Sequence, residues 1–309
     1  MVKTIINEKN WEKADVVLLS APYEKTASSH KGTVNGPEKV VKALNTQIEF
    51  FDRKYKKEVN SFVKIAHQNL KEIKNLLPEE TLNKIKKTYQ KILAKDKFIF
   101  LLGGEHSVCI GAFRALAEKY NPKDVTILQI DAHCDLRKDD SDYTDNPSSL
   151  AHSTVMRHAS SLGFPIIQVG IRTYSTDEYE YFSDKKNNVT VFEWNPSTPA
   201  KATPQEGNKI WQPPLINTIL KAIKTKYLYI TIDVDGFDPS VMPGTGTAVQ
   251  GGLEWWYGVN LIEKAINAKE LIGADIVEIS PIPDSVLTEY SSAQLCYSMI
   301  AEKFRDKLK

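Results

Sequence analysis

Residues 125–135 read Val-Thr-Ile-Leu-Gln-Ile-Asp-Ala-His-Cys-Asp, an apolar run of strand length that leads directly into acidic and histidine side chains. The arrangement occurs twice more: residues 98–102 lead into Gly-Gly-Glu-His-Ser at 103–107, and residues 227–232 lead into Asp-Val-Asp at 233–235. Nearly continuous apolar runs are typical of strands that are covered on both faces in a parallel sheet. The stretch therefore predicts such a sheet, with polar side chains where its strands end.

Similar runs recur along the chain, with helical stretches between them. Strands are predicted at residues 16–20, 98–102, 125–130, 166–171, 189–192, 227–234 and 276–279. Helices are predicted at residues 37–44, 61–77, 79–94, 110–120 and 261–268, the second of them from apolar residues at three- and four-residue spacing. The alternation of strands and helices predicts an α/β fold with a mainly parallel sheet.

The composition is that of an ordinary globular protein, and it excludes several classes. The 309 residues include 40 Lys and Arg and 39 Asp and Glu, so the near-zero net charge gives no general electrostatic reason to bind nucleic acid or an anionic membrane. No apolar run approaches the roughly 18–20 residues that span a bilayer. The start of the chain has no apolar stretch typical of a signal peptide, and the three cysteines do not suggest a disulfide framework, which together predict a cytoplasmic protein.

The chain carries no internal repeat or low-complexity linker, so a single domain over residues 1–309 is predicted. Residues 138–149 and 195–214 are largely polar and are predicted to be loops. Loops of that length in a compact domain are often functional lids or insertions.

The acidic and histidine residues after the three strands form a candidate metal site. Strand alternation would turn Asp131, His133 and Asp135 to one side if the strand continued, and the same rule applies to Asp233 and Asp235. Four converging aspartates would repel one another without a counter-charge, which a pair of divalent cations would supply. The expected ligands are His106, Asp131, His133, Asp135, Asp233 and Asp235. Because most donors are oxygen atoms, the set suits Mn²⁺ better than zinc.

Simpler interpretations exist for each piece. An isolated Asp-x-Asp is more often a helix cap or a turn than a metal site, and it is the coincidence of three motifs that favours metal. By alternation Cys134 points away from the ligands, so it is predicted to be a small buried residue. His30, His67 and His158 have no supporting pattern and are taken as surface or core histidines.

The three motifs together resemble the signatures of the ureohydrolase family, which includes arginases and agmatinases. They are Gly-Gly-Glu-His-Ser at 103–107, Asp-Ala-His-Cys-Asp at 131–135 and Ile-Asp-Val-Asp-Gly-Phe-Asp-Pro-Ser at 232–240. The segments at 31–37, 168–172 and 275–281 are also similar to family segments. The resemblance implies a three-layer α/β/α fold, two Mn²⁺ per chain and hydrolysis of a guanidino compound to urea and an amine.

The agmatinase branch is the more similar one. Leu136-Arg137, residues 151–157 and residues 243–247 resemble agmatinases, whereas arginases carry an Asn-containing segment in place of Leu136-Arg137. The sequence departs from the branch in a longer acidic loop around 139–142, in Ala248-Val249-Gln250 where agmatinases commonly have Pro-Glu, and in an enlarged loop at 195–214. Agmatine, yielding putrescine and urea, is therefore the expected substrate.

The resemblance also implies roles for individual residues. Asp135 would orient the attacking hydroxide as well as bind metal, and His152 would pass a proton to the leaving amine. Glu278 would anchor the guanidinium group, the alternative being a buried ion pair with Arg172. For Asp238, contact with a substrate nitrogen and organisation of the turn both stay open. Trp255 and Trp256 are taken as packing or interface residues.

Several alternatives remain open at this point. Guanidinobutyrate, guanidinopropionate, guanidine, arginine and formimidoylglutamate are other possible substrates. A catalytically inactive metal-binding homologue and a single-metal deacetylase are alternatives of different classes. The family resemblance further implies a homo-oligomer, either a trimer or a hexamer, whose ligand is a small molecule and not a polymer or a membrane.

Overall fold

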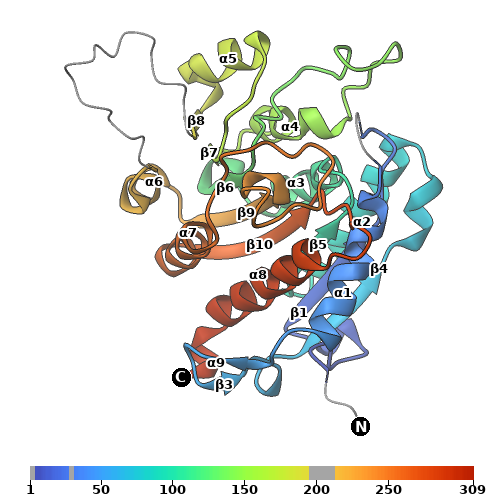
Figure 1. The fold of residues 1–309 in the computed structure, drawn as a ribbon, viewed down its shortest axis with the longest axis vertical. Coiled ribbons are helices and arrows are strands. Elements are labelled where there is room, and N and C mark those ends of the chain that lie inside the picture. Colours follow the sequence, from blue (N-terminus) through green and yellow to red (C-terminus); the bar gives the residue numbers. More distant parts are fainter. Residues whose placement is uncertain (1–3, 28–30, 195–212) are drawn as a thin grey trace.

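The computed structural model describes residues 4–27, 31–194 and 213–309, and it places a parallel sheet at the centre of the molecule (Figure 1). Eight strands lie in the order β4-β1-β5-β10-β9-β6-β7-β8, and every neighbouring pair is parallel. Their bounds are β1 Val16–Ala21, β4 Ile65–Asn69, β5 Phe98–Gly103, β6 Val125–Ile130, β7 Ile166–Val169, β8 Val189–Phe192, β9 Tyr227–Asp233 and β10 Glu270–Val277. A short antiparallel pair, β2 (Phe51–Asp52) and β3 (Lys57–Glu58), lies apart from this sheet.

Helices cover both faces of the sheet, because successive residues of each strand point to opposite sides. In β1, Val16 and Leu18 join one apolar core, whereas Val17 and Leu19 join the other. The first core is closed by α1 (Gly36–Thr46), α6 (Ile216–Ala222), α7 (Trp255–Ala268) and α8 (Leu287–Lys303), and the second by α2 (Pro78–Leu93), α3 (Val108–Lys119) and α4 (Val155–Ser161). Two further helices are α5 (Thr176–Ser183) and α9 (Arg305–Leu308). The predicted three-layer α/β/α fold is confirmed.

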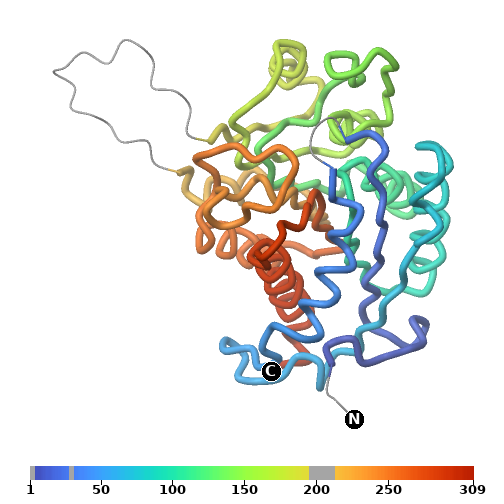
Figure 2. Tube along the Cα trace, turned by 45° about the vertical axis from the view of Figure 1, so that its right-hand side comes forward, coloured from blue at the N-terminus to red at the C-terminus, as the bar shows by residue number. Residues whose placement is uncertain are grey.

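Segments from the two ends of the chain lie together in this arrangement. Figure 2 shows α1, near the N-terminus, running beside α8, near the C-terminus, and residues of the two helices are in contact. Strands from both halves of the chain join the one sheet. The single-domain organisation over residues 1–309 nevertheless stays a prediction.

The helix predicted at residues 61–77 is wrong. This segment forms the edge strand β4 between two 3-10 helices, Val59–Ser61 and Lys71–Asn75. The strand pairs in parallel with β1, and its first residues, Ile65 and Ala66, are buried while the next three are only half-buried. A half-exposed edge strand with polar residues has the same mixture of apolar and polar positions as an amphipathic helix, which explains the error.

Other predicted elements exist with different ends. The strand expected at 276–279 begins at Glu270 and ends at Val277, and the helix expected at 261–268 begins at Trp255. Residues 138–149 contain no helix or strand, as predicted. Of the loop expected at 195–214, residues 195–212 lie outside the part that the structure describes.

Candidate metal centre and active site

The predicted ligands converge at the carboxyl end of the sheet, which is where parallel α/β folds bind ligands. His106 follows β5, Asp131 follows β6, and Asp233 is the last residue of β9. Because β10 lies between β5 and β9, Glu278 at the end of β10 enters the same region. Strand order therefore brings together residues that lie far apart in the chain.

One group of candidate ligands surrounds His106. Its Nδ1 atom lies 3.0 Å from Asp135 Oδ2, 3.4 Å from Asp131 Oδ2 and 3.7 Å from Asp233 Oδ2. All four residues are buried. Within the described part of the chain, this Nδ1 atom is a buried polar atom without a hydrogen-bond partner. A buried nitrogen that faces three carboxylates and has no partner fits a metal-ligand role.

A second group surrounds His133 and shares one aspartate with the first. His133 Nδ1 lies 3.1 Å from Asp235 Oδ2 and 3.6 Å from Asp131 Oδ1, so the two oxygens of Asp131 face different histidines. His106, Asp131 and Asp233 could hold one ion, and Asp131, His133 and Asp235 another. The geometry thus provides two adjacent candidate metal positions joined by Asp131.

The side chains converge although the strands do not continue through the motifs, so the condition under which strand alternation would align them is not met. Strand β6 ends at Ile130, and Asp135 has a positive φ of 52°, so residues 131–135 turn instead of extending. Asp233 ends β9, and Asp235 lies in the 3-10 helix Val234–Gly236, with its backbone N–H donating to Asp233 Oδ1 at 3.0 Å. Tight turns after the strands, not longer strands, bring the side chains together.

The electrostatics of the cluster also fit bound cations. Burial and the neighbouring charge of Asp131 raise the pKa of Asp135 to about 7. Burial and the charge of Asp235 raise the pKa of Asp233 well above its ordinary value. Burial lowers the pKa of His106, but Asp131 and Asp135 outweigh it and raise this pKa well above the ordinary value. Divalent cations would relieve the carboxylate repulsion that adds to burial in raising the pKa values of Asp135 and Asp233.

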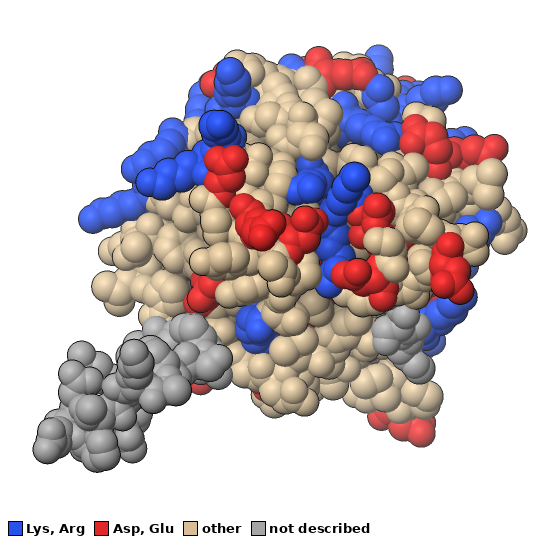
Figure 3. Space-filling view, turned by 90° about the horizontal axis from the view of Figure 1, so that it is seen from above, with Lys and Arg blue, Asp and Glu red and all other residues tan. Residues whose placement is uncertain are grey.

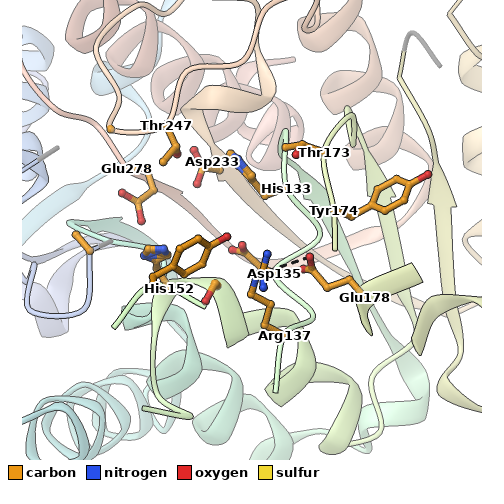
Figure 4. A pocket seen from close by; sticks show the side chains of 14 residues that line it. His133, Asp135, Arg137, His152, Thr173, Tyr174, Glu178, Asp233, Thr247 and Glu278 are labelled. Atoms are coloured by element: carbon orange, nitrogen blue, oxygen red, sulfur yellow. Dashed lines mark ion pairs between the residues drawn. The ribbon is translucent and has the colours of Figure 1, made fainter. Parts of the chain in front are cut away.

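Three of the candidate ligands, His133, Asp135 and Asp233, line a cavity of about 300 Å³ (Figure 4). It is lined by Ala27, His133, Asp135, Arg137, Tyr143, His152, Ser153, Thr173, Tyr174, Glu178, Asp233, Gly246, Thr247 and Glu278. In Figure 4, Glu278 and His152 lie on one side of Asp135, and Glu178 and Tyr174 lie on the other. The cavity is therefore continuous from the candidate ligands to an aromatic and charged rim.

Glu278 is held in an unusual conformation at the cavity wall. It has a positive φ of 62°, which costs a non-glycine residue about 1–2 kcal/mol. Its backbone N–H donates to Gly104 O at 2.8 Å, and its Oε1 accepts from the His106 backbone N–H at 2.7 Å. Burial, followed by the charge of Glu105, raises the pKa of Glu278 well above its ordinary value. A buried carboxyl group of this kind gains most from a cationic partner.

His152 begins a short 3-10 helix, His152–Thr154, beside the cavity. Its backbone N–H donates to Thr26 Oγ1 at 3.3 Å. Burial, with smaller contributions from His106 and His133, lowers the pKa of the imidazole to about 4. A neutral imidazole at pH 7 can accept a proton and pass it on.

The rim contains residues that the sequence did not single out for a role. The Arg137 guanidinium lies 4.8 Å from the centre of the Tyr143 ring, forms an ion pair with Asp142 and lies 3.9 Å from Glu178 Oε2. Glu178 also accepts from the Leu136 backbone N–H at 3.0 Å. The sequence signals for this part of the cavity were the acidic run at 139–142 and the agmatinase-like pair Leu136-Arg137, neither of which indicated a contact with Glu178.

Asp238 lies outside the cavity lining. Its Oδ1 accepts from the Ser240 backbone N–H at 2.9 Å, and its Oδ2 accepts from Gly251 and Gly252 backbone N–H groups at 2.8 and 3.2 Å. The carboxylate thus holds two loop segments together. This placement favours the turn-organising role over contact with substrate.

Other side chains that the sequence singled out lie away from the cavity lining. The suggested ion pair of Arg172 with Glu278 is wrong, because this guanidinium donates to backbone oxygens, including those of Asp235 and Val249 at 2.6 Å. Trp255 packs near Phe237 with ring centres 6.1 Å apart, whereas Trp256 is exposed.

The remaining cysteine and histidine predictions concern the core and the surface. Cys134 is buried in the apolar core, as predicted. His67 pairs with Ser20 and His158 with Ser149 O, and His30 lies outside the described residues.

The surface near the rim shows no large patch made up of only acidic or only basic side chains. Seen from above in Figure 3, acidic and basic side chains are interspersed across the middle of this face. Among the helices that the structure describes, none has both the length and the apolar character needed to cross a membrane. The visible face is thus consistent with the near-zero net charge of the whole chain.

Comparisons with known proteins agree with this geometry. The model of the arginase family matches residues 14–301. The chain is 32% identical to the N(1)-aminopropylagmatine ureohydrolase of Synechocystis sp., over 97% of this chain and 93% of that protein. It is also 32% identical to the agmatinase of Halalkalibacterium halodurans, over 91% of this chain and 89% of that protein.

A solved structure shows the same relationship in three dimensions. The agmatine ureohydrolase of Thermoplasma volcanium superposes with a TM-score of 0.78 at 26% identity, covering 99% of this chain and 95% of that one. Together with the family match, this likeness confirms the resemblance seen in the sequence motifs. The chain belongs to the arginase family of hydrolases, in its agmatinase-like branch.

Proposed function

We propose that this protein hydrolyses a cationic guanidino amine to urea and an amine with the help of two Mn²⁺ ions, and that its best candidate substrate is agmatine, which yields putrescine. One observation carries the proposal: two histidine–aspartate groups that share Asp131 open into the cavity that also contains Glu278. The arginase-family match and the agmatinase relatives support the same class of reaction.

The proposed metal ligands follow from the donor atoms. His106, Asp131, Asp135 and Asp233 would hold one ion, and Asp131, His133 and Asp235 the other. Oxygen donors are in the majority, which favours Mn²⁺ over zinc. When bound, two such cations lower the pKa of a shared water and so supply a nucleophile at neutral pH.

The side chains around the cavity would perform the remaining tasks. The Glu278 carboxylate would accept N–H bonds from the planar guanidinium group and so hold its carbon facing the aspartates. Asp135 would orient the attacking water. His152, neutral at pH 7 because its pKa is lowered to about 4, would take up a proton and deliver it to the leaving amine.

The charge of the cavity favours a cationic substrate over an anionic one. Four aspartates would balance two divalent cations, which leaves Glu278 and Glu178 as further acidic groups in the lining. Arg137 is already engaged by Asp142, Glu178 and the Tyr143 ring. Guanidinobutyrate, guanidinopropionate and formimidoylglutamate, which carry carboxylates, are therefore weaker candidates.

A second candidate substrate is N(1)-aminopropylagmatine, named for the Synechocystis relative. The observation that favours it is the rim, where the partly exposed rings of Tyr143 and Tyr174 border the cavity. Aromatic faces attract ammonium groups, and because the Tyr143 ring already contacts Arg137, the Tyr174 ring is the proposed contact for the second amine of a longer substrate. We also propose a homo-oligomer, a trimer or hexamer, and a cytoplasmic location.

The proposal is tested with a panel of guanidino compounds, Mn²⁺ and a urea assay, together with metal analysis. Close to two metal ions per chain and urea from agmatine or N(1)-aminopropylagmatine are expected. Retained activity in an Asp131→Ala/Asp233→Ala double variant would refute the two-metal account. Full metal occupancy with no activity on the whole panel would instead support a metal-binding homologue without hydrolase activity.

A further inference from the structure

A row of buried polar residues crosses the sheet directly below the candidate metal ligands. Gln168 on β7, Gln129 on β6, Thr231 on β9 and Asp275 on β10 are register partners across four neighbouring strands. All four side chains are completely buried in mainly apolar strands. Buried polar groups are unfavourable unless they are bonded, so the row calls for an explanation beyond packing.

Strand alternation places this row on the same face of the sheet as the ligands, two residues earlier along each strand. Gln129 stands two residues before Asp131, and Thr231 two residues before Asp233. Gln129 Nε2 donates to Asp131 Oδ2 at 2.6 Å, and Thr231 Oγ1 lies 2.9 Å from His106 Nε2. The row therefore contacts candidate ligands of both metal positions.

The row also holds the turn that carries further ligands. Gln168 Nε2 donates to Cys134 O at 2.7 Å and to Gln129 Oε1. Cys134 lies between His133 and Asp135, so this bond fixes the backbone from which both side chains project. The two glutamines thus tie β6, β7 and the 131–135 turn together.

The Thr231 hydroxyl group determines which nitrogen of His106 carries the proton. This hydroxyl donates its only hydrogen to Asp275 Oδ1 at 2.7 Å, so its oxygen is left to accept from His106 Nε2–H. In the neutral ring, Nδ1 then carries the lone pair and faces the space between Asp131, Asp135 and Asp233 that a cation would occupy. A hydrogen bond to the distal nitrogen is a recurring device for orienting metal-binding histidines.

We propose that Gln168, Gln129, Thr231 and Asp275 form a positioning layer that orients His106, Asp131 and the 131–135 turn for metal binding. The proposal rests on the metal centre of the proposed function, but not on the identity of the substrate. None of the four residues lines the cavity, so their effect on catalysis is indirect.

The test measures metal affinity by calorimetry and the Mn²⁺ electron paramagnetic resonance signal. Thr231→Val keeps the shape of the side chain and removes the hydroxyl, and it is expected to weaken Mn²⁺ binding by about 10- to 100-fold. Thr231→Ser should restore most of the affinity because it restores the hydroxyl. Gln129→Leu, which removes the donor to Asp131, should weaken binding similarly.

Thr126→Val is the matched control. Thr126 is also buried, lies in the same sheet and hydrogen-bonds to Thr225 Oγ1 at 2.7 Å, but it stands about 16 Å before Asp131 along β6. It should leave Mn²⁺ affinity unchanged. Circular dichroism and thermal unfolding of the metal-free variants separate misfolding from lost positioning.

The outcomes distinguish this inference from the proposed function. Folded Thr231→Val and Gln129→Leu variants that bind Mn²⁺ as tightly as the wild type overturn the positioning layer. A wild-type protein that binds two Mn²⁺ ions but hydrolyses no guanidino compound overturns the proposed function. The Mn²⁺ affinities of the variants would still test the positioning layer in that case. A wild type that binds no divalent metal overturns both.

Discussion

Replacing Glu278 by Gln tests whether this side chain holds a guanidinium group. The substitution removes the negative charge and keeps the shape and one acceptor oxygen. That acceptor matters because Glu278 Oε1 accepts from the backbone N–H of His106 at 2.7 Å. Glu278→Ala would leave this N–H without its partner and could displace a metal ligand, so Gln separates the two effects.

The expected magnitude follows from the burial of the site. Glu278 is only 9% exposed, so its interaction with a bound cation is little screened by water. Removing one partner of a buried charge pair costs about 2–5 kcal/mol. Because the amide oxygen of Gln can still accept a hydrogen bond, the loss for Glu278→Gln is expected in the lower part of that range. A loss of about 2–3 kcal/mol corresponds to a fall in kcat/KM of about 30- to 150-fold.

The assay combines urea release with metal analysis and thermal unfolding. Metal content should stay at the wild-type value, because Glu278 belongs to neither candidate ligand group. Burial raises the pKa of Glu278, so the neutral Gln should leave the metal-free protein as stable as the wild type or more so. Glu302→Gln is the control: Glu302 is a buried carboxyl group bonded to Tyr55 and Asn267, at 2.9 and 3.0 Å, away from the cavity.

Two results would refute the reasoning. Wild-type kcat/KM in Glu278→Gln would show that the carboxylate does not bind the guanidinium group. Lost metal in the same variant would show that Glu278 supports the ligands instead. Glu302→Gln is expected to lower the unfolding temperature and leave kcat/KM unchanged.

Three further predictions concern other parts of the site. His152→Gln should lower kcat by about 10²- to 10⁴-fold with unchanged metal content, because the proton carrier is lost; unchanged kcat in steady-state kinetics would contradict this role. Asp238→Asn should reduce the free energy of unfolding by about 1 kcal/mol in urea and leave kcat/KM within about twofold, since the carboxylate holds a turn. Once its metal has been removed with a chelator, the protein should be less stable at pH 8 than at pH 5.5. The pKa of Asp135 is about 7 in the folded state and 3.8 ordinarily, so the folded state holds the Asp135 proton more tightly than the unfolded state does. The stabilisation that this proton provides is therefore lost as the pH rises through 7. Saturating Mn²⁺ should remove this loss, and equal denaturation midpoints at the two pH values without metal would count against it.

The sequence predicts the strands and the candidate ligands well because their signals are local. Each ligand stands within a few residues of an apolar run, as Asp131 does after Ile130, and the chemistry of the motif is visible without knowing the fold. His152 and Glu278 carry no such local signal, and only the family resemblance assigned them roles.

The failures have a common physical cause, which is that burial depends on neighbours far away in the chain. Helix α8 was not among the predicted helices. It carries buried polar residues such as Ser292 and Glu302 among its apolar ones, so the sequence lacks the amphipathic pattern by which a helix is recognised. The polar row cannot be recognised in the sequence, because Gln129 and Thr231 look like isolated polar residues in mainly apolar strands until the register of those strands is known.

The strand order has a consequence for the synthesis of the protein. The six candidate ligands stand at or just after the ends of β5, β6 and β9, which all leave the ribosome before β10, and β10 is the strand that lies between β5 and β9 in the sheet. A nascent chain that has not yet emerged past Val277 therefore cannot bring His106 next to Asp233. The candidate position around His106 should therefore be completed only once β10 has been inserted, whereas the candidate position around His133 is formed at the ends of β6 and β9, which pair with each other directly.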